Sequence, residues 1–112
     1  MALYFKTSDP RGLLAEFKKA IDAHHIETWS YDSDDDFTHT AQQWKSLAWL
    51  RPEIRSDELA LFIVTPKNKT LSSEVYAIYH GRFIEAMVRH CDRLFSNGIA
   101  TALPKEKDRI QG

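Results

Sequence analysis

The stretch LALFIV, residues 59–64, is apolar at every position. A strand with one face in water alternates apolar and polar residues, whereas a strand that is covered on both faces does not. Residues 59–65 therefore predict a central strand of a sheet. The turn-forming residues Arg55-Ser56-Asp57 precede this strand, and a polar loop over residues 66–69 follows it.

Two further strands are expected before this one, over residues 37–45 and 46–54, although residues 42–50 could instead hold a short helix. Pro52 has no N–H to donate to a neighbouring strand, so the second segment should end there or lie at a sheet edge. The acidic run DSDDD, residues 32–36, predicts a solvated turn, because clustered like charges and aspartate side chains both disfavour regular structure.

Two amphipathic helices are expected. The first spans residues 10–24, because Ser8-Asp9-Pro10 is a typical helix start and apolar residues recur on one face, together with His24. The second spans residues 71–95 and ends at Ser96-Asn97-Gly98, where Asn or Gly can adopt the left-handed cap conformation. The arc of the second helix that should face the core holds Tyr76, Ala77, His80, Phe83, Ile84, Met87, Val88, Cys91, Leu94 and Phe95.

Short strands over residues 1–6, 26–31 and 99–103 complete the order β-α-β-β-β-β-α-β. This order predicts an α+β fold, a two-layer sandwich with a mostly antiparallel sheet and both helices on one face. No linker separates two compositions, so we expect a single domain over residues 1–103. Residues 104–112 are polar and are expected to form a mobile tail.

The composition narrows the classes of function. Of the 112 residues, 43% are hydrophobic and 28% are charged, as in ordinary globular proteins. The net charge of −1 gives no overall attraction to nucleic acid or to an anionic membrane. No apolar run approaches the ~20 residues that span a bilayer, and the N-terminal residues do not resemble a signal peptide. A cytoplasmic protein is therefore expected, with neither nucleic acid nor a membrane as a partner.

No metal or cofactor is expected. Asp32, Asp34 and Asp36 match the first three ligand positions of a calcium loop, but Phe37 stands where glycine is needed and Gln43 where a glutamate is needed. No histidine pair has the spacing of a zinc site. The four glycines are too dispersed for a phosphate-binding loop or a dinucleotide fingerprint.

His80 is the most informative polar residue, because it lies near the centre of the apolar arc of the second helix. Either it is a hydrogen-bonded core residue, or it lines a pocket as an acid–base or ligand-binding group. Tyr76 and Arg82 are its candidate partners in such a pocket, and His24 should point into the same layer. Gly81 within a helix suggests the close approach of another backbone or of a ligand.

Cys91 falls within the apolar arc without a cationic neighbour on that face, so we interpret it as a small buried hydrophobe rather than a nucleophile. A nucleic-acid surface would need Trp29, Tyr31 and Trp49 on an open sheet face. Glu27 shares the face of Trp29, and the acidic turn is adjacent, so phosphate would be repelled.

Self-association is suggested by apolar surface that a two-layer domain leaves uncovered. Val75, Ile78 and Tyr79 lie opposite the core-facing arc, and Trp29 and Tyr31 add large side chains. Contiguous patches of this kind mark interfaces, and a two-fold homodimer is the commonest closed assembly. The alternative is that residues 37–54 fold back over Ile78 and Tyr79 within one chain.

Two functions therefore remain open from the sequence. The first is a non-enzymatic interaction or regulatory domain that forms a homodimer and that could also bind another protein. The second is a small enzyme or ligand-binding protein with a pocket at Tyr76, His80 and Arg82, in which His80 would be the candidate catalytic residue. A pocket with convergent polar groups would favour the second, and a solid core with His80 bonded to backbone would favour the first.

Overall fold

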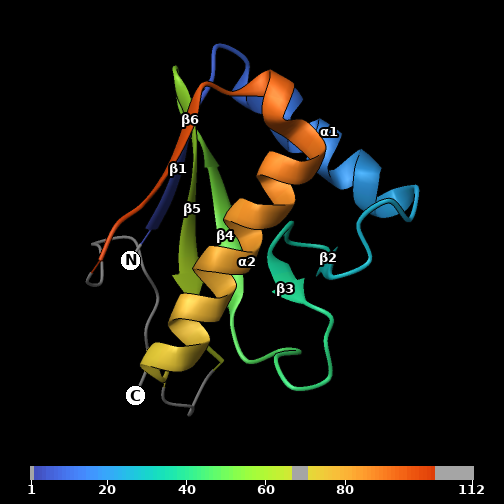
Figure 1. Cartoon of the computed structure of the whole chain (residues 1–112), viewed down its shortest axis with the longest axis vertical. Coiled ribbons are helices and arrows are strands. Elements are labelled where there is room, and N and C mark those ends of the chain that lie inside the picture. The colour runs from blue at the N-terminus through green and yellow to red at the C-terminus, as the bar shows by residue number, and fades with distance from the viewer. Residues whose placement is uncertain (1, 67–70, 103–112) are drawn as a thin grey trace.

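The computed structural model describes residues 2–66 and 71–102, which form a six-stranded antiparallel sheet with two helices on one face (Figure 1). The strand order is β2-β3-β4-β5-β1-β6. The expected α+β sandwich is thus confirmed, whereas the expected tail over residues 104–112 and most of the 66–69 loop lie outside the described residues. The elements are β1 (Ala2–Lys6), α1 (Pro10–Asp22), β2 (Trp29–Tyr31), β3 (Phe37–His39), β4 (Trp49–Ile54), β5 (Glu58–Val64), α2 (Ser73–Cys91), a 3₁₀ turn (Asp92–Leu94) and β6 (Asn97–Ala100).

Strand β5 is the central strand that its apolar sequence predicted. It lies between β4 and β1 and pairs antiparallel with both. Leu59, Leu61 and Ile63 are buried in the main core, which both helices share. Ala60 and Phe62 point to the opposite face, because successive side chains alternate along a strand, and they are buried there with Ala2.

The sheet face away from the helices is covered in part by a stacked arginine. The Arg55 guanidinium lies 5.5 Å from the ring centres of both Tyr4 and Phe62. Glu53 and Glu58 hold it there through hydrogen bonds of 2.8 Å each. This second face is therefore covered at Phe62, whose exposed fraction is only 5%.

Helix α1 ends earlier than the sequence predicted, and this moves His24. Asp9 caps its start by accepting a hydrogen bond of 3.0 Å from the Gly12 amide. At the other end His24 adopts a φ of 63°, and the amide of His25 donates to the Ala20 carbonyl at 2.9 Å. These features form a left-handed helix stop, which turns His24 into solvent. The prediction that His24 shares a layer with His80 is wrong.

Strands β2 and β3 form a hairpin that pairs Trp29 with His39 and Tyr31 with Phe37. The aspartate run is the predicted turn: the Asp32 carboxylate accepts from the amides of Asp34 and Asp36, at 2.9 and 3.0 Å. Both strands are shorter than expected, and residues 42–46 form turns rather than a strand or a helix. Side chains of β3 bind the backbone of this turn: His39 Nδ1 accepts from the Ala41 amide, and Thr38 Oγ1 accepts from the Ser46 amide.

Strand β4 continues through Pro52, whereas the sequence predicted an end or a sheet edge there. The strand lies between β3 and β5, and Pro52 pairs with Leu61 of β5. On the other side, β3 pairs with β4 only at Leu50. At Pro52, β4 therefore has no second neighbouring strand that would need an N–H from this residue. The rule that proline does not donate within a sheet is thus still obeyed.

Helix α2 buries a side that is rotated from the predicted arc. Tyr79 and Ala86 are buried, while Ala77 and Val88, which the arc included, are exposed. The helix carries apolar residues on nearly every side, so its periodicity alone could not select the buried one. Packing of the β2–β3 hairpin against Tyr79 selects it, as the ring distance of 5.5 Å between Trp29 and Tyr79 shows.

Two glycines give opposite predictions for stability. A Cβ at Gly81 would meet nothing within 4 Å, so the close approach expected there from the sequence is not found, whereas a Cβ at Gly98 would lie 2.9 Å from the Phe5 ring. Gly81→Ala should raise the free energy of unfolding by about 0.5–1 kcal/mol, because alanine restricts the unfolded chain and favours helix. Gly98→Ala should lower it. Urea denaturation of both variants checks the pair, and shifts of the same sign would contradict it.

Candidate functional site

His80 is a core residue that bonds to its own helix. Its exposed fraction is 2%, and its ring lies 5.0 Å from that of Tyr76. Nδ1 lies 2.7 Å from the backbone carbonyl oxygen of Tyr76. Because a carbonyl only accepts, Nδ1 carries the proton in this bond. The prediction that His80 faces the core is confirmed, and this hydrogen bond joins it to the backbone of its own helix.

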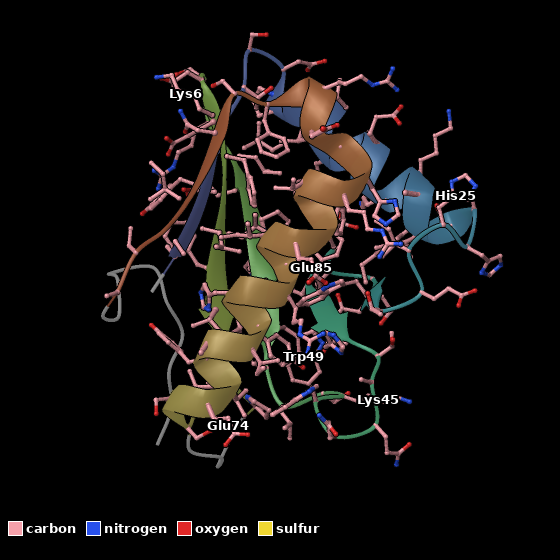
Figure 2. The ribbon with its side chains drawn as sticks, viewed as in Figure 1. Lys6, His25, Lys45, Trp49, Glu74 and Glu85 are labelled. Atoms are coloured by element: carbon pink, nitrogen blue, oxygen red, sulfur yellow. The ribbon has the colours of Figure 1, made fainter. Side chains whose placement is uncertain are left out.

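The structure does not gather the three residues predicted to form a pocket. Tyr76 and His80 are buried, whereas Arg82 is exposed and acts electrostatically on His39 of β3. His25, next to His24, lies at the far end of α1 in Figure 2, away from α2's first turns. The pocket predicted around His80 therefore has neither its expected cation nor its second imidazole.

Three hollows share Arg93 and Leu94 in their linings, and Lys6, which Figure 2 labels, lines the largest of them. The largest has a volume of about 530 Å³, and none of the three is lined by Tyr76, His80 or Arg82. The Lys6 ammonium lies 3.8 Å from the Asp57 carboxylate, and Arg93 adds a second positive charge to the lining of this hollow. No local sequence pattern predicted this hollow, because its lining residues come from distant segments: Lys6, Thr7, Ser8, Asp57, Arg93, Leu94, Phe95 and Ser96.

Carboxylates of the acidic turn accept hydrogen bonds from the protein itself. Asp36 is buried rather than solvated, and its carboxylate receives two bonds from Arg51, at 3.0 and 2.8 Å. Asp32 serves as the acceptor that shapes the turn. Within residues 2–66 and 71–102, no group of three side chains of the metal-binding types is close enough to hold an ion.

The residues predicted to form an interface divide into two groups. Trp29 and Tyr79 are buried, so the prediction that they face solvent is wrong. Tyr79 is covered by the segment after β3, because its hydroxyl donates to the Trp44 carbonyl and lies 3.0 Å from the Thr38 hydroxyl. This is the within-chain alternative. The other three, Val75, Ile78 and Tyr31, are half-buried, and their role in an interface stays a prediction.

The aromatic residues do not form one platform on which bases could stack. Trp29 packs on the helix side of the sheet, against the Phe83 ring at 5.1 Å. Trp49 pairs with Val64 and shares the opposite face with Phe62, as alternation along β5 requires. The surface that nucleic-acid stacking would need is therefore split between the two faces.

His39 is a polar residue that the sequence did not single out. Its exposed fraction is 4%, and Nδ1 accepts a hydrogen bond of 3.0 Å from the Ala41 amide. Burial lowers the pKa of His39, and the positive charge of Arg82 lowers it further. His39 pairs with Trp29 across the hairpin, and this pairing could have indicated that the imidazole is buried. The sequence instead predicted a strand over residues 37–45, whereas the chain turns directly after His39.

Comparison with known proteins found no matching family model, no similar curated protein and no matching solved structure. No helix in the described part of the chain is long and apolar enough to cross a membrane. Inference about function therefore depends on the residues and their geometry.

His80→Ala is expected to lower the free energy of unfolding by roughly 1–3 kcal/mol, because it leaves a cavity and removes a buried hydrogen bond. His24→Ala, at the exposed helix stop, is the matched control and should change it little. Chemical denaturation measures both. An unchanged midpoint for His80→Ala would show that the imidazole does not contribute to the core.

Cys91 should be unreactive in the folded protein, as the sequence predicted for a buried hydrophobe. Burial raises its pKa from an ordinary 9.0 to about 11. Two pH units correspond to about a hundredfold fewer thiolates near neutral pH, and the thiolate is the reactive form. Alkylation by iodoacetamide should therefore be slow in buffer and fast in urea. Equal rates would show that the thiol is accessible and ionisable in the native state.

Proposed function

We propose that this chain is a non-enzymatic interaction domain that associates with a second copy of itself through the outer edge of β6. The observation that carries the proposal is the character of this edge strand. Its sequence is Asn-Gly-Ile-Ala, without charge or proline, and all four residues are exposed. Ile99 has 53% of its surface in contact with water, the highest value among the large hydrophobic residues described.

An unprotected edge is unusual, because it offers unpaired N–H and C=O groups to any other strand. Natural proteins protect such edges with charges, proline, bulges or a covering element. The opposite edge, β2, has such protection: it is three residues long, and the acidic run 32–36 follows it directly. Strand β6 lies at the other margin of the sheet in Figure 1, with β1 as its neighbour.

The backbone of β6 suits two-fold pairing. The Thr101 amide donates to the Ala2 carbonyl at 2.9 Å, on the β1 side. Since amides alternate in direction along a strand, those of Gly98 and Ala100 point outward. A two-fold axis beside the middle of β6 would place this strand antiparallel to its own copy, with the same groups contributed by each chain. Leu94, just before β6, adds further exposed apolar surface.

A second copy fits this edge better than a charged partner would. The strand itself carries no charge that would select an acidic or basic peptide, and its small side chains allow close approach of an identical strand. The bonding of His80 to its own helix supports an interaction domain over an enzyme, since the candidate catalytic residue is engaged in holding α2.

Light scattering of the full chain tests the proposal. At micromolar to millimolar concentration we expect a species of twice the 13.0 kDa chain mass. Ala100→Pro should shift it to the monomer without changing the far-ultraviolet circular dichroism, because it removes an outward amide only. Ala100→Ser, which keeps the amide, should remain dimeric.

Ile99→Lys provides a second variant, which adds a charge to the exposed edge and should also weaken association. A wild-type chain that stays monomeric throughout the concentration range would overturn the proposal. So would a dimer that neither variant weakens, since the interface would then lie elsewhere.

A further inference from the structure

Trp29 holds a buried donor that nothing in the structure satisfies. The side chain is 1% exposed, and its indole Nε1 has no hydrogen-bond partner. Leaving a buried donor unpaired costs roughly 1–3 kcal/mol, so such groups are rare in native proteins. They mark positions where a ligand or a bound water supplies the acceptor.

His39 supplies a second donor beside the first. Its ring meets that of Trp29 edge to face, with centres 5.1 Å apart. Since Nδ1 accepts the Ala41 amide, the ring proton lies on Nε2. Burial and the neighbouring Arg82 lower the pKa of His39, which keeps the ring neutral near pH 7. No hydrogen bond from Nε2 is found among the described residues.

Arg82 is the charged residue, within the described part of the chain, that acts on His39. On α2, Arg82 lies between Tyr79 and Phe83 in the sequence. The rings of Tyr79 and Phe83 both pack against Trp29. The Arg82 guanidinium is exposed and forms no ion pair with another residue of the described chain. Among the described residues, no carboxylate contributes to the shift in the pKa of His39.

We propose that Trp29, His39 and Arg82 form a binding site for the carboxylate group of a small organic acid. The three side chains present N–H donors from β2, β3 and α2, and none of the three offers an acceptor to the others. A carboxylate has two oxygens that accept hydrogen bonds, and it carries one negative charge. That charge matches the single cation of the site, whereas a phosphate dianion would exceed it.

The indole N–H groups report directly on this site. The chain has three tryptophans and therefore three indole N–H signals in a ¹H–¹⁵N correlation spectrum. Trp44→Phe and Trp49→Phe assign two of them, and the third belongs to Trp29 even if Trp29→Phe fails to fold. Titration with sodium acetate should shift the Trp29 signal downfield and to saturation, with the other two unchanged. Sodium chloride at equal ionic strength should leave all three in place.

Two arginine variants on the same helix separate the site from general charge effects. Arg82→Gln should weaken acetate binding roughly tenfold, which corresponds to loss of about 1.4 kcal/mol. Arg89→Gln removes the same charge from an exposed position on α2 and should leave the affinity unchanged. Equal effects of the two variants would overturn the proposal.

A Trp29 signal that does not respond to acetate would also overturn it. If that signal lies far upfield in every buffer, the N–H points at the face of a neighbouring ring. The planes of Tyr79 and Phe83, at 87° and 80° to the indole, allow such a contact. Neither result depends on the oligomeric state, so this test and that of the β6 edge fail independently.

Discussion

The fold depends on one phenyl ring, that of Phe83. Its centre lies 6.1 Å from the ring of Phe5, 4.7 Å from Phe17, 5.1 Å from Trp29 and 5.5 Å from Phe37. These partners come from β1, α1, β2 and β3, so a residue of α2 joins elements that are distant in sequence. Aromatic rings combine large buried area with a preference for tilted or edge-to-face contacts. The positions of these four elements against α2 are therefore coupled to one another through this ring.

Local sequence signals predicted the elements but not the side that α2 buries. The uninterrupted apolar stretch of β5, the Asp9 cap and the aspartate turn are each set by neighbouring residues, and each was identified. Tyr79 was placed in solvent because a helix that is apolar nearly all round has no strong periodicity. Thr38 and Trp44 bind the Tyr79 hydroxyl in the structure. Contacts between residues this far apart in the sequence cannot be predicted from a local pattern. The end of α1 was missed because a histidine takes the left-handed position usually held by glycine.

The buried polar groups of the core differ in whether they find a hydrogen-bond partner. Around His80, Tyr79 and Asp36 each buried polar side chain bonds to backbone or to an opposite charge, as packing of a polar group requires. Among the residues that the structure describes, only the Trp29 indole is a buried side-chain donor without a partner. The sequence pattern indicated His80, whose hydrogen bond is made, because apolar neighbours predict that a polar side chain is buried but not whether it finds a partner. The sequence pattern thus indicated Arg82 but not the Trp29–His39 pair, which forms only when the hairpin closes.

The acidic turn after β2 has a consequence for assembly at high concentration. A sheet with two open edges can add copies without limit, as in a fibril. Here one edge ends in four carboxylates, of which Asp36 is paired with Arg51 and Asp35 with Lys18. Two such tips brought together would repel each other, more strongly at low ionic strength. Growth of the sheet through this edge is therefore opposed, and the association proposed at the β6 edge would yield a finite particle rather than a filament.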